Sequence, residues 1–328
     1  MGEFDLIARY FTRPARQAVL GVGDDCALLQ PAAGMQMAIS TDMLIEGRHF
    51  FAAVDAASLG HKALAVNLSD LAACGAKPLA FTLALALPQV DETWLQAFSS
   101  GLWALADTHS CELIGGDTTQ GPLNICITVF GEVPAGQALL RSGARSGDDI
   151  YVSGSPGDAR LGLEALRKTI ALPPALMQQA VMRLQRPTPR VALGMALRGI
   201  ATAAIDLSDG LTGDLAHILK ASGKGASINS YFATESIAGC AHSAFTAGHI
   251  DHKSLLQCVL AGGDDYELAF TAPVAARKAV ELAAAASGTG VTRIGRIDDK
   301  PGLRLLDSDG QPLQQQLVSF DHFVPGAG

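Results

Sequence analysis

Six short acidic segments recur along this 328-residue chain, and most of them directly follow an apolar run of strand-like composition. They contain Asp24 and Asp25, Asp42, Asp70, Asp117, Asp206 and Asp209, and finally Asp264, Asp265 and Glu267. An isolated aspartate in such a place is most often a turn residue or a helix N-cap. Six segments together favour another explanation, because ligands of α/β folds bind where strand ends meet. The pattern therefore predicts an α/β protein whose carboxylates gather at one cleft.

The segments between the acidic positions alternate between strand-like and helix-like patterns. We expect strands at 35–40, 79–87, 113–114, 124–132, 149–153, 201–207 and 291–297. We expect helices at 3–11, 58–74, 92–109, 158–168, 211–221 and 275–286. In this scheme Asp42 and Asp117 follow strands, and the Asn67 to Asp70 stretch interrupts a helix.

The length favours two domains, because one core of average size does not need so many residues. The composition turns to Gly, Arg, Ser and Asp around residues 136–149, which predicts an N-terminal domain of residues 1–137 and a C-terminal domain of residues 138–328. Residues 67–71 resemble residues 206–210. Two related α/β halves are therefore plausible, whereas a solenoid is excluded.

Composition removes several classes of protein. A net charge of −8 argues against a nucleic-acid binder. The longest apolar run, residues 79–87, is far shorter than the roughly 20 residues of a membrane helix, and residues 1–5 lack the features of a secretory signal. The six cysteines include no C-x-x-C pair, so we expect reduced thiols without a zinc site. We expect a cytoplasmic protein with no membrane or nucleic-acid partner.

Several carboxylates in one cleft repel each other unless cations neutralise them. Hard oxygen ligands without nearby His or Cys point to Mg²⁺, and Ser40, Thr41 and Ser208 add neutral oxygens. An acidic protein that gathers Mg²⁺ ions is suited to a polyphosphate, which suggests phosphoryl transfer from ATP. The chain has no P-loop sequence, since residues 222–225 lack the required preceding glycine, and it has no protein-kinase signature.

Six motifs then occur in one order over nearly the whole chain. They are Gly21-x-Gly23-Asp24-Asp25-Cys26-Ala27, Ser40-Thr41-Asp42 followed by His49-Phe50, Asn67-Leu68-Ser69-Asp70-Leu71-Ala72-Ala73-Cys74-Gly75-Ala76, Gly115-Gly116-Asp117-Thr118-Thr119, Asp206-x-Ser208-Asp209-Gly210-Leu211 and Gly262-Gly263-Asp264-Asp265-Tyr266-Glu267-Leu268. With the closing Phe320-Asp321-His322-Phe323, these motifs resemble the thiamine-monophosphate kinase family, which is related to aminoimidazole ribonucleotide synthetase and selenophosphate synthetase.

This resemblance implies ATP-dependent phosphorylation of thiamine monophosphate to thiamine diphosphate, the last step of that cofactor's synthesis. The implied fold is the two-domain α/β (α+β) fold of aminoimidazole ribonucleotide synthetase. Its N-terminal domain has a mixed sheet that forms a β-barrel with the partner copy of a homodimer, and its C-terminal domain is α/β.

The resemblance also implies roles for individual residues. The implied magnesium positions are Asp25, Ser40, Thr41, Asp42, Asp70, Asp117, Asp206 and Asp209. The implied nucleotide contacts are Gly116, Asp117, Arg141 and Ser208, and the implied substrate contacts are His49, Glu267 and Phe320. Catalysis would rest on Asp42, Asp70, Asp117 and Asp209. Two positions depart from the family, His109 where an aromatic residue is common and Arg48 where a small or neutral residue is usual.

Local sequence allows simpler roles for some of these residues. His49 suits a core histidine or a cap, Glu267 a helix cap, Phe320 a docking aromatic and Arg141 a surface charge. The Gly-rich turn at residues 154–158 resembles a phosphate cradle, but such a turn before a helix is more often structural.

The acceptor in this reaction is a phosphate monoester, whose second pKa is about 6. At pH 7 it is largely a dianion and needs no strong general base. We therefore expect direct in-line transfer without a phosphoenzyme. Two alternatives stay open: a sister synthetase with the same Mg²⁺–ATP core, and a magnesium–nucleotide sensor without turnover. The complete acidic set argues against the sensor.

Overall fold

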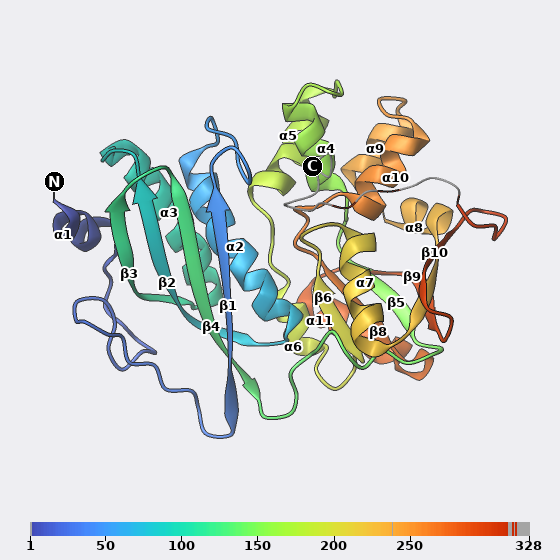
Figure 1. Cartoon of the computed structure of the whole chain (residues 1–328), viewed down its shortest axis with the longest axis horizontal. Coiled ribbons are helices and arrows are strands. Elements are labelled where there is room, and N and C mark those ends of the chain that lie inside the picture. Colours follow the sequence, from blue (N-terminus) through green and yellow to red (C-terminus); the bar gives the residue numbers. More distant parts are fainter. Residues whose placement is uncertain (1, 238, 314–316, 318, 320–328) are drawn as a thin grey trace. The chain divides into compact units, whose positions relative to one another are not determined.

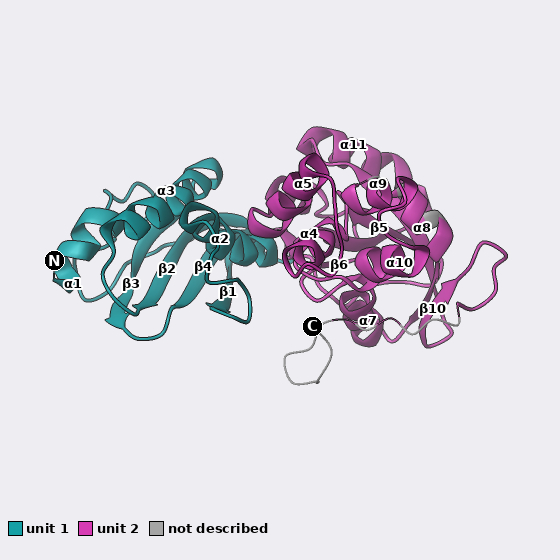
Figure 2. Ribbon diagram, turned by 90° about the horizontal axis from the view of Figure 1, so that it is seen from above, with its two compact units in different colours: residues 1–71, 76–138 teal, residues 72–75, 139–328 magenta. Residues whose placement is uncertain are grey.

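The computed structural model describes residues 2–237, 239–313, 317 and 319, and it divides into two compact units (Figures 1 and 2). Unit 1 contains residues 1–71 and 76–138, and unit 2 contains residues 72–75 and 139–328. The main division thus falls after Ala138, beside the expected boundary at 137. Residues 72–75, which are the last two residues of the helix Ala56–Ala73 and the two turn residues after it, belong to unit 2. No helix in the described ranges is both long and apolar enough to cross a membrane.

Unit 1 is built on a four-stranded sheet in the order β1-β4-β2-β3. The strands are β1 (Met35–Ile45), β2 (Lys77–Leu87), β3 (Glu112–Gln120) and β4 (Asn124–Pro134). Strand β4 is antiparallel to β1 and β2, whereas β2 and β3 are parallel. The expected mixed sheet is therefore present. Neither sheet formed by the described residues closes into a barrel within one chain.

Two long helices cover one face of this sheet (Figure 2). The helices of unit 1 are α1 (Glu3–Leu6), the π-helical η1 (Ile7–Phe11), α2 (Ala56–Ala73) and α3 (Glu92–His109). Helices α2 and α3 pack very closely, because a Cβ atom at Gly60 would lie 2.0 Å from the Phe98 carbonyl oxygen. Beneath them Leu83 and Leu85 of β2 are buried. This packing fixes α2 against the sheet.

The other face of the unit 1 sheet is partly open. Residues 18–29 pack on one part of it, through Ala18, Ala27 and Leu29. The side chains of β1 that point to this face include Ile39, Met43 and Ile45, which are 61%, 49% and 41% exposed. A long edge strand with exposed apolar side chains favours association with another surface.

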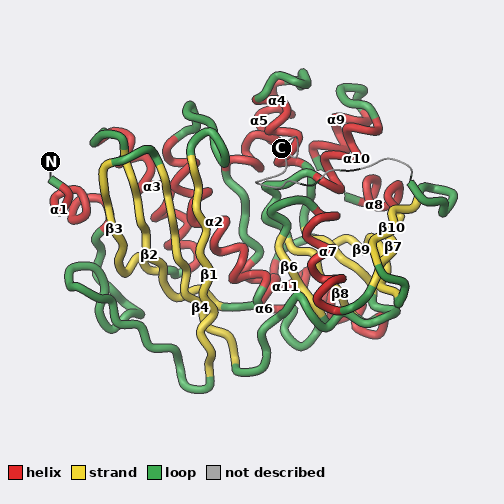
Figure 3. Tube along the Cα trace, viewed as in Figure 1, coloured by secondary structure: helices red, strands yellow, loops and turns green. Residues whose placement is uncertain are grey.

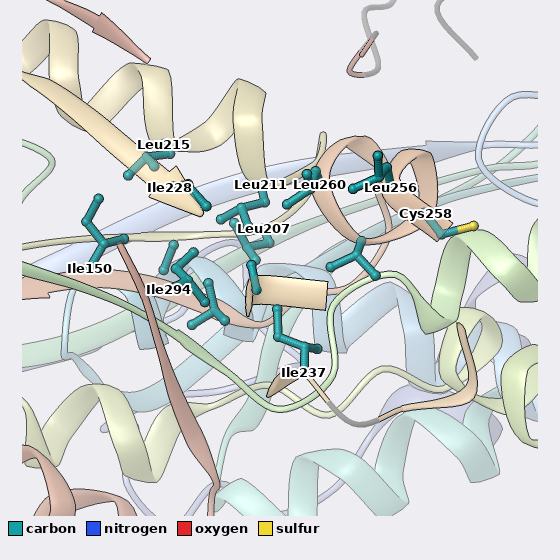
Figure 4. Packing of buried hydrophobic residues seen from close by; sticks show 14 of the residues in the cluster. Ile150, Leu207, Leu211, Leu215, Ile228, Ile237, Leu256, Cys258, Leu260 and Ile294 are labelled. Carbon is teal, nitrogen blue, oxygen red and sulfur yellow. The ribbon is translucent and has the colours of Figure 1, made fainter. Parts of the chain in front are cut away.

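Unit 2 contains a mixed six-stranded sheet in the order β10-β7-β9-β5-β8-β6, with β10 and β7 parallel and the other neighbours antiparallel. The strands are β5 (Asp149–Ser153), β6 (Ala203–Asp206), β7 (Gly225–Asn229), β8 (Leu268–Ala272), β9 (Val291–Asp298) and β10 (Gly302–Leu306). The helices are α4 (Asp158–Leu166), α5 (Pro174–Gln185), α6 (Val191–Ala196), α7 (Leu211–Ser222), α8 (Ser230–Ser236), α9 (Cys240–Thr246), α10 (His252–Ala261), the 3₁₀ turn η2 (Val274–Ala276) and α11 (Arg277–Ser287). Leu211 and Leu215 of α7 and Leu256 and Leu260 of α10 lie in one buried core with Ile150 of β5 (Figure 4).

Three of the expected acidic turns are wrong, because the residues lie inside regular elements (Figure 3). Asp42 lies within β1, which pairs with β4 without interruption from Met35 to Ile45. Asp117 lies within β3, which continues through both glycines. Asp70 lies within the unbroken helix α2. In each case tertiary pairing overrides the local turn preference of the sequence.

Several other expected helices and strands agree closely with the observed ones. β2, β4, β5, β9 and α3 match their expected bounds within two residues. The strands β7 and β10 and the helices α8 and α9 were not expected. They are short and lack a distinctive period, so only their packing in unit 2 reveals them.

Candidate active site

In unit 1, strand β1 and helix α2 are joined by two hydrogen bonds that involve acidic-motif residues. The Ser40 hydroxyl donates to Asp70 Oδ2 at 2.5 Å, and the Asp42 backbone N–H donates to Asn67 Oδ1 at 3.0 Å. The Asn67 amide nitrogen in turn donates to the Ala63 carbonyl at 3.0 Å, so this residue holds β1 without breaking its helix. The fold thus brings residues 40–42 beside residues 67–70.

This donor set fits Mg²⁺. Ser40, Asp42 and Asp70 offer one hydroxyl and two carboxylate groups, which are the hard oxygen ligands that Mg²⁺ prefers. Among the described residues, no three His, Cys, Asp or Glu side chains form a cluster that could hold a metal alone. Mg²⁺ usually binds one or two carboxylates together with water and substrate phosphates. The arrangement therefore suits an ion that arrives with a polyphosphate.

Thr41 and Asp117 lie on the open face of the same sheet. The Thr41 and Thr128 hydroxyl oxygens are 2.8 Å apart across β1 and β4. The row of paired residues that contains Asp117 runs through Ala84 and Cys126 to Met43. Asp42 belongs to the next row and points to the helix-covered face, because side chains alternate along a strand. Unit 1 therefore separates Asp117 from Asp42 and Asp70, which were expected to act together.

Position 116 requires a glycine, because β3 and β2 lie too close together there for a side chain. Its φ is +148°, and a Cβ atom there would lie 1.9 Å from the Leu83 carbonyl oxygen. No residue with a side chain fits this position. The glycine fixes the backbone that carries the exposed Asp117.

His49 follows β1 after a turn at Gly47, whose φ is +76°. The Ile45 backbone N–H donates to His49 Nδ1 at 3.0 Å. A neutral imidazole with Nδ1 as acceptor carries its proton on Nε2. An Nε2–H group can donate to an anionic oxygen, and the contact between His49 and the substrate stays a prediction.

Asp25 lies in an exposed turn between the paired residues Leu20 and Leu28, as the sequence suggests. Gly23 has a φ of +124°, and the Asp25 N–H donates to Asp24 Oδ1 at 2.8 Å. This is a local turn, and its predicted role as a magnesium ligand stays a prediction.

In unit 2 two acidic motifs lie side by side after β6. The Asp264 N–H donates to the Ser208 carbonyl and the Tyr266 N–H donates to the Leu207 carbonyl, both at 2.8 Å. Asp264 and Tyr266 have φ values of +66° and +51°, an uncommon conformation for residues with side chains. The segment of residues 262–267 is therefore held against the loop that carries Ser208 and Asp209, as expected for strand-end turns that meet.

Asp214 of α7 has a role that sequence reasoning missed. Its carboxylate is buried and accepts the backbone N–H groups of Asp209 and Gly210, each at 3.0 Å. Burial, followed by the nearby Asp209 charge, raises the pKa of Asp214 to about 7. A local signal existed, since an acid in the first turn of a helix often accepts backbone N–H groups.

Glu267 is 0% exposed and surrounded by protein donors. Its carboxylate accepts hydrogen bonds from Arg183 Nη2 at 2.8 Å, Arg190 Nε at 2.6 Å and the Ser153 hydroxyl at 2.5 Å. The two arginines were not expected here. Glu267, the residue before β8, is therefore bound to α5 and to the residue before α6. Its predicted contact with the substrate stays a prediction.

The contacts of the Gly-rich turn at residues 154–158 indicate that this turn has a structural role and does not bind phosphate. Asp265 Oδ1 and Oδ2 both accept the Gly157 N–H at 2.9 Å, and the Ala159 N–H donates to Oδ1 at 3.4 Å. Burial raises the pKa of Asp265 well above its ordinary value. An internal carboxylate thus takes the place that a phosphate would occupy at this helix N-terminus.

The remaining predicted site residues are Asp206, Arg141 and Phe320. Asp206 ends β6 and is 6% exposed. Arg141 is exposed. The residue before it, Leu140, is held beside β6, because its carbonyl accepts the Ala204 N–H at 2.9 Å. Phe320 lies outside the described residues.

Comparison with known proteins identifies two family models and close relatives. Residues 23–133 match the AIR synthase related protein, N-terminal domain, and residues 145–308 match the corresponding C-terminal domain. A thiamine-monophosphate kinase from Salmonella typhimurium is 47% identical over an alignment of 328 positions that covers 98% of each chain. The crystal structure of thiamine-monophosphate kinase from Stenotrophomonas maltophilia is similar with a TM-score of 0.82, at 43% identity over 94% of this chain and 96% of that one.

A second solved structure is AaThiL complexed with AMPPCP and TMP. It has a TM-score of 0.77 and 28% sequence identity, over 90% of this chain and 89% of that one.

Proposed function

The chain belongs to the thiamine-monophosphate kinase family of AIR synthase related proteins, and we propose that it transfers the terminal phosphoryl group of ATP to thiamine monophosphate. The product is thiamine diphosphate, so this is the last step in the synthesis of that cofactor. The observation that carries the proposal is 47% identity over 98% of both chains. The AMPPCP and TMP bound by the 28% identical neighbour support the same pair of substrates.

Magnesium binding by this chain is part of the proposal. In unit 1 the ligands are Ser40, Asp42 and Asp70 on one face of the sheet, Thr41 and Asp117 on the other, and Asp25 in its turn. In unit 2 they are Asp206 and Asp209. When bound, Mg²⁺ neutralises phosphate charge and orients the reacting groups. The Ser40 hydroxyl orients the Asp70 carboxylate for this purpose, and Gly116, Asp117, Arg141 and Ser208 contact the nucleotide.

The chain's own residues position the acceptor. His49 donates from Nε2 to the substrate, while Phe320 and Glu267 are its other predicted contacts. The acceptor phosphate is largely a dianion at pH 7, so no side chain has to remove a proton, and transfer is direct and in line. Mixing the enzyme with ATP that is radiolabelled in its terminal phosphate, without thiamine monophosphate, should leave no label on the protein. A labelled protein that passes its phosphate to thiamine monophosphate would contradict direct transfer.

The proposed function is tested by ADP release from the purified protein with ATP and Mg²⁺. We expect ADP release to depend on thiamine monophosphate and to stop when EDTA removes the metal. Selenide, or the acceptor of aminoimidazole ribonucleotide synthetase, should give no release above the rate without acceptor. Release that depends on either of these acceptors would instead identify the chain as a sister synthetase.

A cytoplasmic location is also part of the proposal. Cys111, Cys240 and Cys258 are buried free thiols, as is usual in a reducing compartment. The net charge of −8 supports substrates delivered with cations and gives no support for a nucleic-acid partner.

A homodimer joined through the open face of the unit 1 sheet is likewise proposed, with the two sheets forming a shared β-barrel. Ile39, Met43 and Ile45 are exposed on this face, and β1 is an edge strand. A second copy of the chain would bury these side chains and pair or cover the edge.

A doubly substituted chain tests this interface. Ile39→Lys with Met43→Lys places two charges on the open face, and burial of unpaired charges is strongly unfavourable, so light scattering should show a monomer. Leu282→Lys is the matched control, because Leu282 of α11 is 60% exposed and lies outside this face. An unchanged dimer in the doubly substituted protein would exclude this surface as the interface.

A further inference from the structure

One buried side chain, that of Asp214, accepts hydrogen bonds from the loop of Ser208, Asp209 and Gly210. Asp214 is 3% exposed, and a single oxygen of its carboxylate, Oδ2, accepts both the Asp209 N–H and the Gly210 N–H. Both distances are 3.0 Å. A buried N–H group that loses its acceptor costs free energy, so both amides are held toward this oxygen. Asp214 therefore restrains two consecutive peptide groups.

The ends of the same loop are fixed by other contacts. Leu207 and Leu211 are 0% and 1% exposed and belong to the unit 2 core (Figure 4). A Cβ atom at Gly210 would lie 2.7 Å from the Ala261 carbonyl carbon, and the Ser208 carbonyl is held by the Asp264 N–H. The Ser208–Asp209 peptide group is thus restrained on its carbonyl side by the Asp264 N–H and on its N–H side by Asp214. The Asp209–Gly210 peptide group is restrained through its N–H by Asp214.

These contacts have a consequence for the neighbouring functional groups. The direction of the Asp209 side chain depends on the peptide groups on either side of it, and one of these also belongs to Ser208. We propose that Asp214 is a positioning residue, which holds Ser208 and Asp209 in the orientation that binds the magnesium nucleotide. The inference rests on the proposed function of this loop and adds a residue to it.

The test compares three proteins by calorimetric titration with a non-hydrolysable ATP analogue in Mg²⁺. In Asp214→Ala both N–H groups lose their acceptor, and we expect Kd for the analogue to rise about tenfold or more, as expected for about 1.4 kcal/mol or more of lost interaction. In Asp214→Asn the amide oxygen can still accept both N–H groups, so Kd should stay within about threefold of the unsubstituted protein. Steady-state kinetics should show the same split, with KM for ATP raised and KM for thiamine monophosphate unchanged.

Asp91→Ala is the matched control. Asp91 Oδ1 also accepts two backbone N–H groups, those of Thr93 and Trp94, at 2.9 and 3.0 Å, but it caps α3 outside the predicted site. It should lower the thermal midpoint without changing Kd. If Asp214→Ala does not fold, Asp214→Ser takes its place, because its short side chain cannot reach both amides.

Several outcomes would overturn the inference. If Asp214→Ala, or Asp214→Ser in its place, binds the analogue as tightly as the unsubstituted protein does, Asp214 does not position Ser208 and Asp209 for nucleotide binding. If Asp214→Asn weakens binding as much as Asp214→Ala, the charge matters and not the acceptor geometry. If the unsubstituted protein binds no magnesium nucleotide, the proposed function fails together with the inference, whereas normal binding with equal Kd values contradicts the inference alone.

Discussion

Asp70→Asn is expected to lower kcat by about 10² or more while the fold stays intact, since one metal-ligand charge is worth several kcal/mol of transition-state stabilisation. Asparagine has nearly the same shape and can still accept the hydrogen bond that the Ser40 hydroxyl donates to Asp70 Oδ2. The substitution therefore removes the charge and leaves the contact between β1 and α2. Turnover is measured at saturating ATP and Mg²⁺, with circular dichroism as the check on folding.

Asp107→Asn serves as the control for this experiment. Asp107 of α3 pairs with Arg13 at the surface, where its side chain is 69% exposed. Its kcat should be unchanged, because exposed ion pairs contribute little. Unchanged turnover of Asp70→Asn at saturating Mg²⁺ would show that Asp70 is not a magnesium ligand in the reaction.

Glu267→Gln is expected to destabilise the protein by about 3–5 kcal/mol, because removal of one partner leaves buried charges uncompensated. The remaining charges are the guanidinium groups of Arg183 and Arg190, both of which bind the fully enclosed Glu267 carboxylate. Their side chains are only 20% and 17% exposed. Urea unfolding of the protein without substrates measures the effect.

The result also decides between two roles of Glu267. Glu281→Gln is the control, because Glu281 is 65% exposed and pairs with Lys278 at the surface, so its loss should cost less than about 1 kcal/mol. If Glu267→Gln is as stable as this control but raises KM for thiamine monophosphate, the structural role is wrong and the substrate contact implied by the family resemblance is right.

The acidic motifs led to the family and the general fold, but not to the local conformation of each motif. Glycine and aspartate near apolar runs predict turns. At Asp42 and Asp117 pairing with neighbouring strands extends β1 and β3 through the motif instead. Only the register then reveals that these two carboxylates point to opposite faces of the sheet. The turn after β6 was expected correctly because Gly210 and the start of α7 are local signals.

The surroundings of Glu267 illustrate a second limit. Arg183 and Arg190 lie 84 and 77 residues away from it in sequence, and no local period connects them. Buried ion pairs between distant elements depend on packing, which a single sequence does not display. Asp214 is different, since an acid in the first turn of α7 carries a local signal that was not used.

The central claim is that this chain converts thiamine monophosphate to thiamine diphosphate by direct phosphoryl transfer. It is tested most directly by chromatography with phosphorus detection after incubation with ATP, Mg²⁺ and thiamine monophosphate, beside a sample with EDTA. We expect thiamine diphosphate and ADP in equal amounts, and neither in the EDTA sample. ADP with inorganic phosphate but no thiamine diphosphate, or bound substrates without any product, would contradict the claim.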